Sequence, residues 1–138
     1  GLADLVVGAN NHAFIEMLWR EWSPGYDASV DLEFVRKSLA DPKNLQAALG
    51  YYRATLGDGY RDPSLKALQD QMGAGVPTQP LLYLHGADCG CVGVDVFESA
   101  KTLAPANIKF ELIAAAGHFL QLEQPEKVNK LICDFIAG

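Results

Sequence analysis

The chain has 138 residues, 49% of them hydrophobic and 20% charged, which is enough apolar material for one packed domain. Its formal net charge of −6 argues against a nucleic-acid partner, because neutralising phosphates requires an excess of Lys and Arg. No apolar run is long enough to cross a bilayer, and the first residues lack the pattern of a signal peptide, so we expect no membrane partner.

The chain contains three cysteines, Cys89, Cys91 and Cys133. An odd number that includes a closely spaced pair is not a disulfide framework, and it suits a reducing, cytoplasmic location. Cys89 and Cys91 could be two soft metal ligands, but no second pair follows at ligand spacing. We therefore expect no metal and no organic cofactor, and interpret the pair as loop residues.

In the first 75 or so residues, apolar side chains recur at helical spacing. Asn10 and Asn11 can cap a helix that runs to Trp22, and the Pro and Gly of 23–25 then end it. Apolar residues at helical spacing predict further helices. The predicted helices cover residues 12–22, 29 or 31 to 39, 42–56 and, more weakly, 63–72.

The pattern changes after the Gly- and Pro-rich segment 73–80. A nearly continuous apolar run, as in a strand buried on both faces of a parallel sheet, is followed by helical spacing, a second apolar run and a terminal amphipathic helix. The predicted elements are a strand at 81–85, a helix at 94–103, a strand at 108–113 and a helix at 125–136. This order predicts an α/β fold built on one strand–helix–strand unit.

Two parallel strands do not form a stable sheet alone, because each needs neighbours and cover on both faces. We therefore expect additional protein to complete the sheet. Either the N-terminal half of the same protein or a second copy of the chain would supply it.

Two residues able to share acid–base chemistry follow the predicted strands. Asp88 comes just after the first strand and His118 just after the second, so both should lie at the carboxyl edge of the sheet, where ligands bind in such folds. A histidine transfers protons near neutral pH, and a carboxylate orients it and stabilises its charged form. Taken singly, Asp88 is also a common turn former and His118 a common loop residue.

These segments resemble the α/β-hydrolase fold. Residues 80–88 (Pro-Leu-Leu-Tyr-Leu-His-Gly-Ala-Asp) are similar to its acid-bearing strand and loop, and 117–126 with the helix that follows are similar to its histidine loop and last helix. The resemblance implies that residues 76–138 are the C-terminal part of the hydrolase core. It also implies that residues 1–75 are the helical cap, or lid, over the active site.

Residues 47–54 (Ala-Ala-Leu-Gly-Tyr-Tyr-Arg-Ala) resemble the aromatic-Tyr-Arg segment of epoxide hydrolases. The resemblance implies that Tyr52 donates a hydrogen bond to the epoxide oxygen and that an aspartate forms an alkyl-enzyme ester. His118, with Asp88, would activate the water that hydrolyses this ester. The alternative for Tyr52 is simple packing, and esterases and haloalkane dehalogenases can carry a similar segment.

The pocket for a small apolar substrate would be lined by aromatic residues. The predicted lining residues are Phe14, Trp19, Trp22 and Phe119, although the spacing of the first three is also that of ordinary core residues.

The nucleophile elbow and oxyanion loop of the family have no match in these residues. We therefore expect the nucleophile to lie outside this chain, which alone would be incomplete and inactive. The alternatives are a carboxylesterase or haloalkane dehalogenase of the same fold, or a truncated non-catalytic module that binds small molecules or self-associates.

Overall fold

The computed structural model describes residues 1–57, 59–74 and 77–138, so part of the predicted break at 73–80 lies outside the described residues. The chain divides into two compact units. The first, here called the helical unit, comprises Gly1–Glu16 and Ser29–Val76. The second, here called the sheet unit, comprises Met17–Ala28 and Pro77–Gly138.

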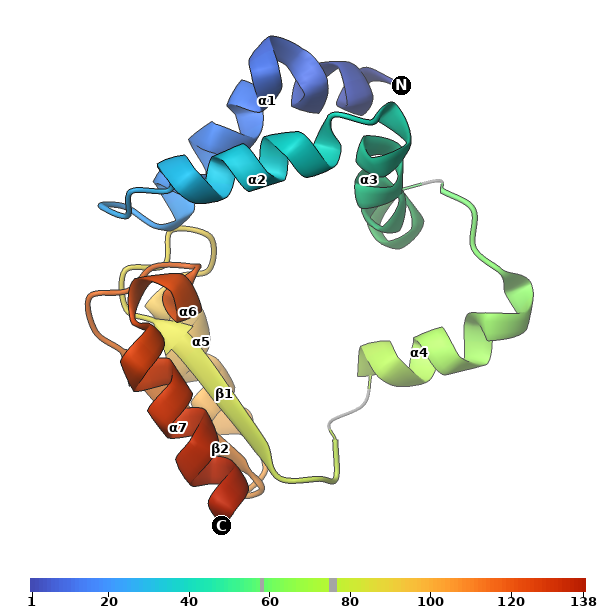
Figure 1. The fold of residues 1–138 in the computed structure, drawn as a ribbon. Helices are drawn as coiled ribbons and strands as arrows, with labels where there is room; N and C mark the ends of the chain where they lie inside the picture. Colours follow the sequence, from blue (N-terminus) through green and yellow to red (C-terminus); the bar gives the residue numbers. More distant parts are fainter. Residues whose placement is uncertain (58, 75–76) are drawn as a thin grey trace. The chain divides into compact units, whose positions relative to one another are not determined.

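The helices predicted for the first part of the chain are confirmed. They are α1 (Leu2–Trp22), α2 (Ser29–Leu39), α3 (Pro42–Leu56), the short 3₁₀ helix η1 (Pro63–Leu65) and α4 (Lys66–Ala74) (Figure 1). Asp41 caps α3 by accepting a hydrogen bond of 2.8 Å from the Lys43 N–H, and Pro42 occupies its first turn, where no backbone donor is needed. Local capping chemistry therefore sets this boundary.

α1 is interrupted at the predicted Asn10–Asn11 cap. Ala9 is extended, and Asn10, Asn11 and His12 have φ values of 49°, 54° and 61°. Asn adopts this left-handed conformation more readily than most non-glycine residues, which explains why the break falls at the two asparagines. A further helical segment precedes the break, so α1 starts earlier than residue 12.

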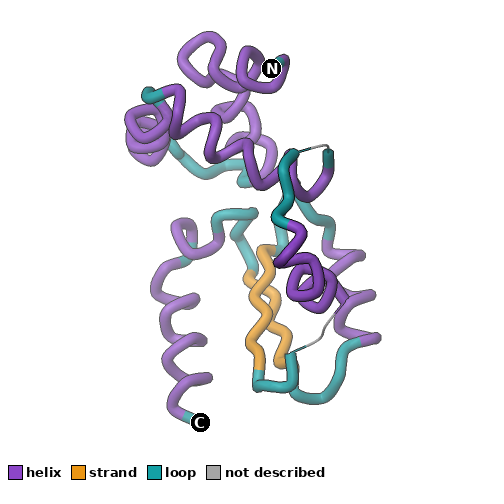
Figure 2. Tube along the Cα trace, turned by 90° about the vertical axis from the view of Figure 1, so that its right-hand side faces the viewer, coloured by secondary structure: helices purple, strands orange, loops and turns teal. Residues whose placement is uncertain are grey.

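The predicted strands and helices of the sheet unit are also confirmed. They are β1 (Leu81–Gly86), α5 (Val94–Leu103), β2 (Ile108–Ile113) and α7 (Pro125–Ala137), with a four-residue helix α6 (Leu120–Glu123) that the sequence did not predict. β1 and β2 run parallel and side by side, in a register that pairs Leu81 with Ile108 and Gly86 with Ile113 (Figure 2). β1 lies between α5 and α7 (Figure 1).

An aromatic cluster packs α5 onto the sheet. Phe97 of α5 is 1% exposed, and its ring centroid lies 5.3 Å from that of His85 and 5.7 Å from that of Phe110. Tyr83 shares the face of His85, because alternate strand residues point the same way, and lies 6.0 Å from Phe97. Burial of these large rings provides much of the stability of the sheet unit.

The first strand is less buried than predicted. The sequence predicted burial on both faces, but residues 81–84 are only half-buried, and burial becomes complete only at His85 and Gly86. The physical reason is that the described sheet has two strands, so each has one hydrogen-bonded neighbour. Among the residues described, no helix combines the length and apolarity that a membrane span requires.

Candidate active site

The loops that follow β1 and β2 lie side by side at the carboxyl edge of the sheet. The Ala87 N–H donates to the Ile113 carbonyl and the Asp88 N–H to the Ala116 carbonyl, both at 2.8 Å. The predicted acid and histidine are therefore carried by adjoining loops, as the parallel strand–helix–strand order requires.

His118 is a half-buried imidazole among aromatic rings. Its ring lies edge-on to Trp22 and Phe119, at centroid distances of 4.9 and 5.2 Å. Burial, and next the positive charge that His85 can carry, lower the pKa of His118 below its ordinary value of about 6.5, while the Glu123 carboxylate opposes this shift. The imidazole is therefore neutral at pH 7, the form that can accept a proton.

The Asp88 carboxylate is exposed, and within the described residues no hydrogen bond or ion pair joins it to His118. The Sγ of the neighbouring Cys89 lies 3.5 Å from Nδ1 of His118. The Val92 N–H also donates to this sulfur, at 3.5 Å. Direct pairing of Asp88 with His118 thus stays a prediction, and the small loop after Asp88 contributes a thiol beside the imidazole.

A small cavity of about 140 Å³ opens at this edge. Its lining residues come from β1 and the two loops: Tyr83, Leu84, His85, Gly86, Cys89, Val92, Gly117, His118 and Leu120. His85 is 4% exposed, and its Nε2 lies 3.1 Å from the Val92 carbonyl, which only a protonated nitrogen can approach as a donor. Its Nδ1 lies 3.3 Å from the Tyr83 hydroxyl, so both ring nitrogens of His85 are engaged and His85 is a wall residue of the cavity.

Three of the four predicted aromatic lining residues gather around the histidine loop. Trp19 stacks on Phe119 with a centroid distance of 3.8 Å, and Trp22 contacts His118. Phe14 belongs to the helical unit and is 36% exposed. A lining role for any of the four toward a substrate stays a prediction.

Tyr52 also belongs to the helical unit. It lies on α3, is 48% exposed, and its ring is 4.1 Å from that of Tyr51. A hydrogen bond between the two phenols raises the pKa of Tyr51. The exposed position of Tyr52 on α3 leaves it accessible, and its role as a hydrogen-bond donor to the substrate stays a prediction.

Sequence reasoning missed two polar residues beside the histidine. Ser23 was interpreted only as part of a helix stop, and Glu123 only as part of a family-like segment, yet the two are hydrogen-bonded at 2.7 Å beneath the histidine loop. The one local signal was Gly117, which precedes His118. Its lack of a side chain permits the close approach of Trp22 and Ser23 to the histidine loop.

Gly117→Ala is expected to destabilise the sheet unit by about 1–3 kcal/mol. A Cβ at this position would lie 2.5 Å from Cα of Ser23 and 2.7 Å from the Trp22 carbonyl oxygen, so backbone would have to move. Urea unfolding followed by circular dichroism measures the change. Gly50→Ala in α3 is the control, since its Cβ would meet nothing within 4 Å and alanine favours the helix. Equal stability of Gly117→Ala and wild type would contradict the tight packing.

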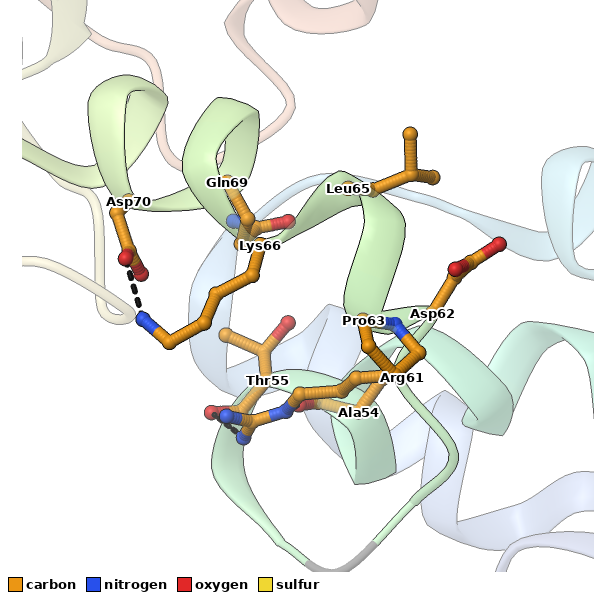
Figure 3. A pocket seen from close by; sticks show the side chains of 9 residues that line it. All are labelled: Ala54, Thr55, Arg61, Asp62, Pro63, Leu65, Lys66, Gln69 and Asp70. Atoms are coloured by element: carbon orange, nitrogen blue, oxygen red, sulfur yellow. Dashed lines mark hydrogen bonds and ion pairs between the residues drawn. The ribbon is translucent and has the colours of Figure 1, made fainter.

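A larger cavity, of about 480 Å³, lies in the helical unit (Figure 3). Its charged groups already have partners: Arg61 donates to the Ala54 and Thr55 carbonyls, and Lys66 pairs with Asp70. Asp62 accepts from Ser64, which lowers the pKa of its carboxyl. The described lining of this cavity contains neither histidine nor cysteine.

Curated proteins resemble this chain over different shares of its length. No protein-family model matches it. Epoxide hydrolase B of Mycobacterium tuberculosis is 28% identical over 123 residues, which are 88% of this chain and 32% of that protein. Carboxylesterase YbfK of Bacillus subtilis is 48% identical over 42 residues, or 30% of this chain and 14% of that protein. The chain thus spans a third or less of the length of these curated relatives.

A solved structure shares the fold. A Klebsiella pneumoniae protein, provisionally named an epoxide hydrolase, superposes with a TM-score of 0.75 at 21% identity, covering 96% of this chain and 44% of that one. The chain therefore has the fold of part of an α/β hydrolase. Together the matches support a relationship to the epoxide-hydrolase-like α/β hydrolases.

Proposed function

We propose that this chain carries the histidine and acid of an epoxide-hydrolase-like enzyme. The observation that carries the proposal is the position of His118 and Asp88, on adjoining loops at the carboxyl ends of two parallel strands, beside a small cavity. The names of the mycobacterial and Klebsiella proteins favour an epoxide as the substrate.

The proposed reaction has two steps. An aspartate outside this chain attacks an epoxide carbon, the carbon–oxygen bond breaks, and the oxygen takes a proton from Tyr52. His118 then removes a proton from water, which attacks the ester carbonyl. As the ester C–O bond breaks, the departing alkoxide takes this proton from the imidazolium to complete the diol, and the proton of the new carboxylic acid returns to the Tyr52 phenolate, leaving the free carboxylate. A phenol suits the first step because it donates to a developing alkoxide while neutral.

Asp88 is proposed to stabilise the imidazolium formed when His118 takes the proton. Only a carboxylate is reliably ionised at neutral pH, whereas a thiol such as Cys89 is a weak partner for a cation. In substrate-free enzymes catalytic hydrogen bonds are often long and tighten with ligand, so the exposed carboxylate is compatible with this role.

The remaining strands of the sheet are proposed to come from the N-terminal half of the same protein or from a second copy of the chain. Support comes from the half-buried residues of β1 and from exposed apolar side chains such as Leu112, which is 38% exposed. Such surfaces are stabilised by additional strands and helices.

Product analysis in labelled water tests the proposal. Over a single turnover in H₂¹⁸O, an ester intermediate places the label in the enzyme carboxylate and leaves the diol unlabelled, because water attacks the ester carbonyl. Label found directly in the diol on the first turnover would indicate direct attack by water, and the alkyl-enzyme mechanism would be wrong.

Ester cleavage is the second candidate. It is favoured by the match to the Bacillus carboxylesterase, which is shorter than the mycobacterial match but has a higher sequence identity. The two activities separate in a paired assay with an aryl epoxide and a p-nitrophenyl ester. Diol formation favours the epoxide hydrolase, and release of p-nitrophenol alone favours the esterase. Turnover of neither, together with reversible binding, favours a non-catalytic module.

A further inference from the structure

The backbone around His118 is held by two side chains, Glu123, which follows closely in sequence, and Ser23, which is distant from it. Ser23, which is 0% exposed, accepts a hydrogen bond of 3.0 Å from the Phe119 N–H and donates one of 2.7 Å to Oε1 of Glu123. Oε2 of Glu123 accepts from the Gly117 N–H at 2.9 Å. The N–H groups of the residues on both sides of the histidine are thus hydrogen-bonded to one Ser–Glu pair.

The amide of His118 itself is fixed by the same segment. It donates to the Trp22 carbonyl at 2.8 Å, and the same oxygen accepts from the Gly90 N–H at 3.1 Å. Three consecutive N–H groups are therefore satisfied, that of Gly117 by Glu123 and those of His118 and Phe119 by the segment 22–23. A loop so held has few alternative backbone conformations, which fixes where the imidazole ring lies.

The chemistry of the pair makes its loss costly. A carboxylate that accepts from an amide and a hydroxyl forms charge-assisted bonds, which are stronger than neutral ones. Removing either partner leaves buried donors or acceptors unsatisfied, at a cost of about 1–3 kcal/mol each. Glutamine is the mildest replacement for Glu123, because its amide oxygen can still accept from the Gly117 N–H while its NH₂ group donates to the Ser23 hydroxyl, but the negative charge that strengthens both bonds is lost.

We infer that Ser23 and Glu123 are positioning residues for His118, holding its loop in the geometry that proton transfer needs. The inference rests on the proposed role of His118 as the base. Neither residue lines the cavity, so neither is expected to touch the substrate.

Glu123 also acts on His118 through its charge. The groups that influence the imidazole are His85, Cys89 and Glu123, and of these the Glu123 carboxylate favours the charged ring. Its removal should lower the pKa of His118 further, so the protonated, inactive form should appear only at lower pH. This shift gives the role of Glu123 a readout separate from stability.

The test compares Glu123→Gln with Glu126→Gln, an exposed carboxylate in the first turn of α7, in the protein that contains this chain. NMR titration of His118 and the pH profile of kcat are measured for both. Glu123→Gln should move both inflections to lower pH and reduce kcat about 10-fold, with little change in KM, because the weaker neutral bonds hold the histidine loop less firmly and misplaced catalytic groups slow chemistry more than binding. Glu126→Gln should match wild type.

Ser23→Ala supplies a second test with the carboxylate charge kept. It should reduce kcat by a similar factor while the titration of His118 moves less than in Glu123→Gln. Ser99→Ala, at an exposed position of α5, is its control. Unchanged kcat in Ser23→Ala and in a folded Glu123→Gln would overturn the inference. Normal turnover in His118→Ala would instead overturn the proposed function, and the NMR titration would still report whether Glu123 is coupled to the ring.

Discussion

His118→Ala is expected to slow turnover about 10²–10⁴-fold, the usual contribution of a general base. The first step, attack on the substrate by the external nucleophile, does not need the imidazole, whereas hydrolysis of the ester does. Substrate should therefore remain bound to the enzyme. Intact-mass measurement after brief mixing with an epoxide would detect the added mass of one substrate molecule, and proteolysis would locate it.

The control is Gln121→Ala, on the exposed side of α6, which should turn over normally. In the wild-type enzyme, the acid limb of the kcat profile should have its inflection below about pH 6.5, because burial lowers the pKa of His118 and the neutral ring is the active form. Unchanged turnover in His118→Ala, or a mass without an adduct, would contradict its assignment as the base.

Phe97→Ala is expected to destabilise the sheet unit by about 3–5 kcal/mol. Phe97 is 1% exposed and contacts the rings of Tyr83, His85 and Phe110, so truncation removes apolar burial and leaves a cavity between α5 and the sheet. Both tryptophans of the chain, Trp19 and Trp22, belong to the sheet unit. Tryptophan fluorescence during urea unfolding therefore reports on this unit alone.

Val96→Ala is the matched control, because Val96 precedes Phe97 on α5 and is 52% exposed. It should change the free energy of unfolding by less than about 1 kcal/mol, as surface substitutions usually do. Similar midpoints for the two variants would mean that the aromatic cluster does not hold α5 to the sheet.

Most of the fold could be predicted from the sequence because its signals are local. The helix that begins at Pro42 is marked by Asp41, and the strands β1 and β2 by short apolar runs. α6 was missed because four residues are too few to show helical periodicity. The burial of β1 was overestimated because burial depends on neighbouring strands, which a local pattern does not reveal.

The sequence predicted which loops carry the residues of the candidate site. Asp88 and His118 follow strands, and parallel strands bring such loops to one edge. The Ser23–Glu123 bond was beyond sequence reasoning, because it joins residues 100 positions apart and neither belongs to a recognisable local pattern. The contact of Cys89 with His118 depends on rotamers within the loop, which spacing does not determine.

The assignment of Met17–Ala28 to the sheet unit has a consequence for chimeric enzymes. A designer who exchanged the helices between relatives at a single junction near residue 76 would also replace the carbonyl of Trp22 and the hydroxyl of Ser23, on which the histidine loop depends. A working exchange needs three junctions, at 16/17, 28/29 and 76/77, so that the donor contributes the helices and the recipient keeps the support of its own histidine.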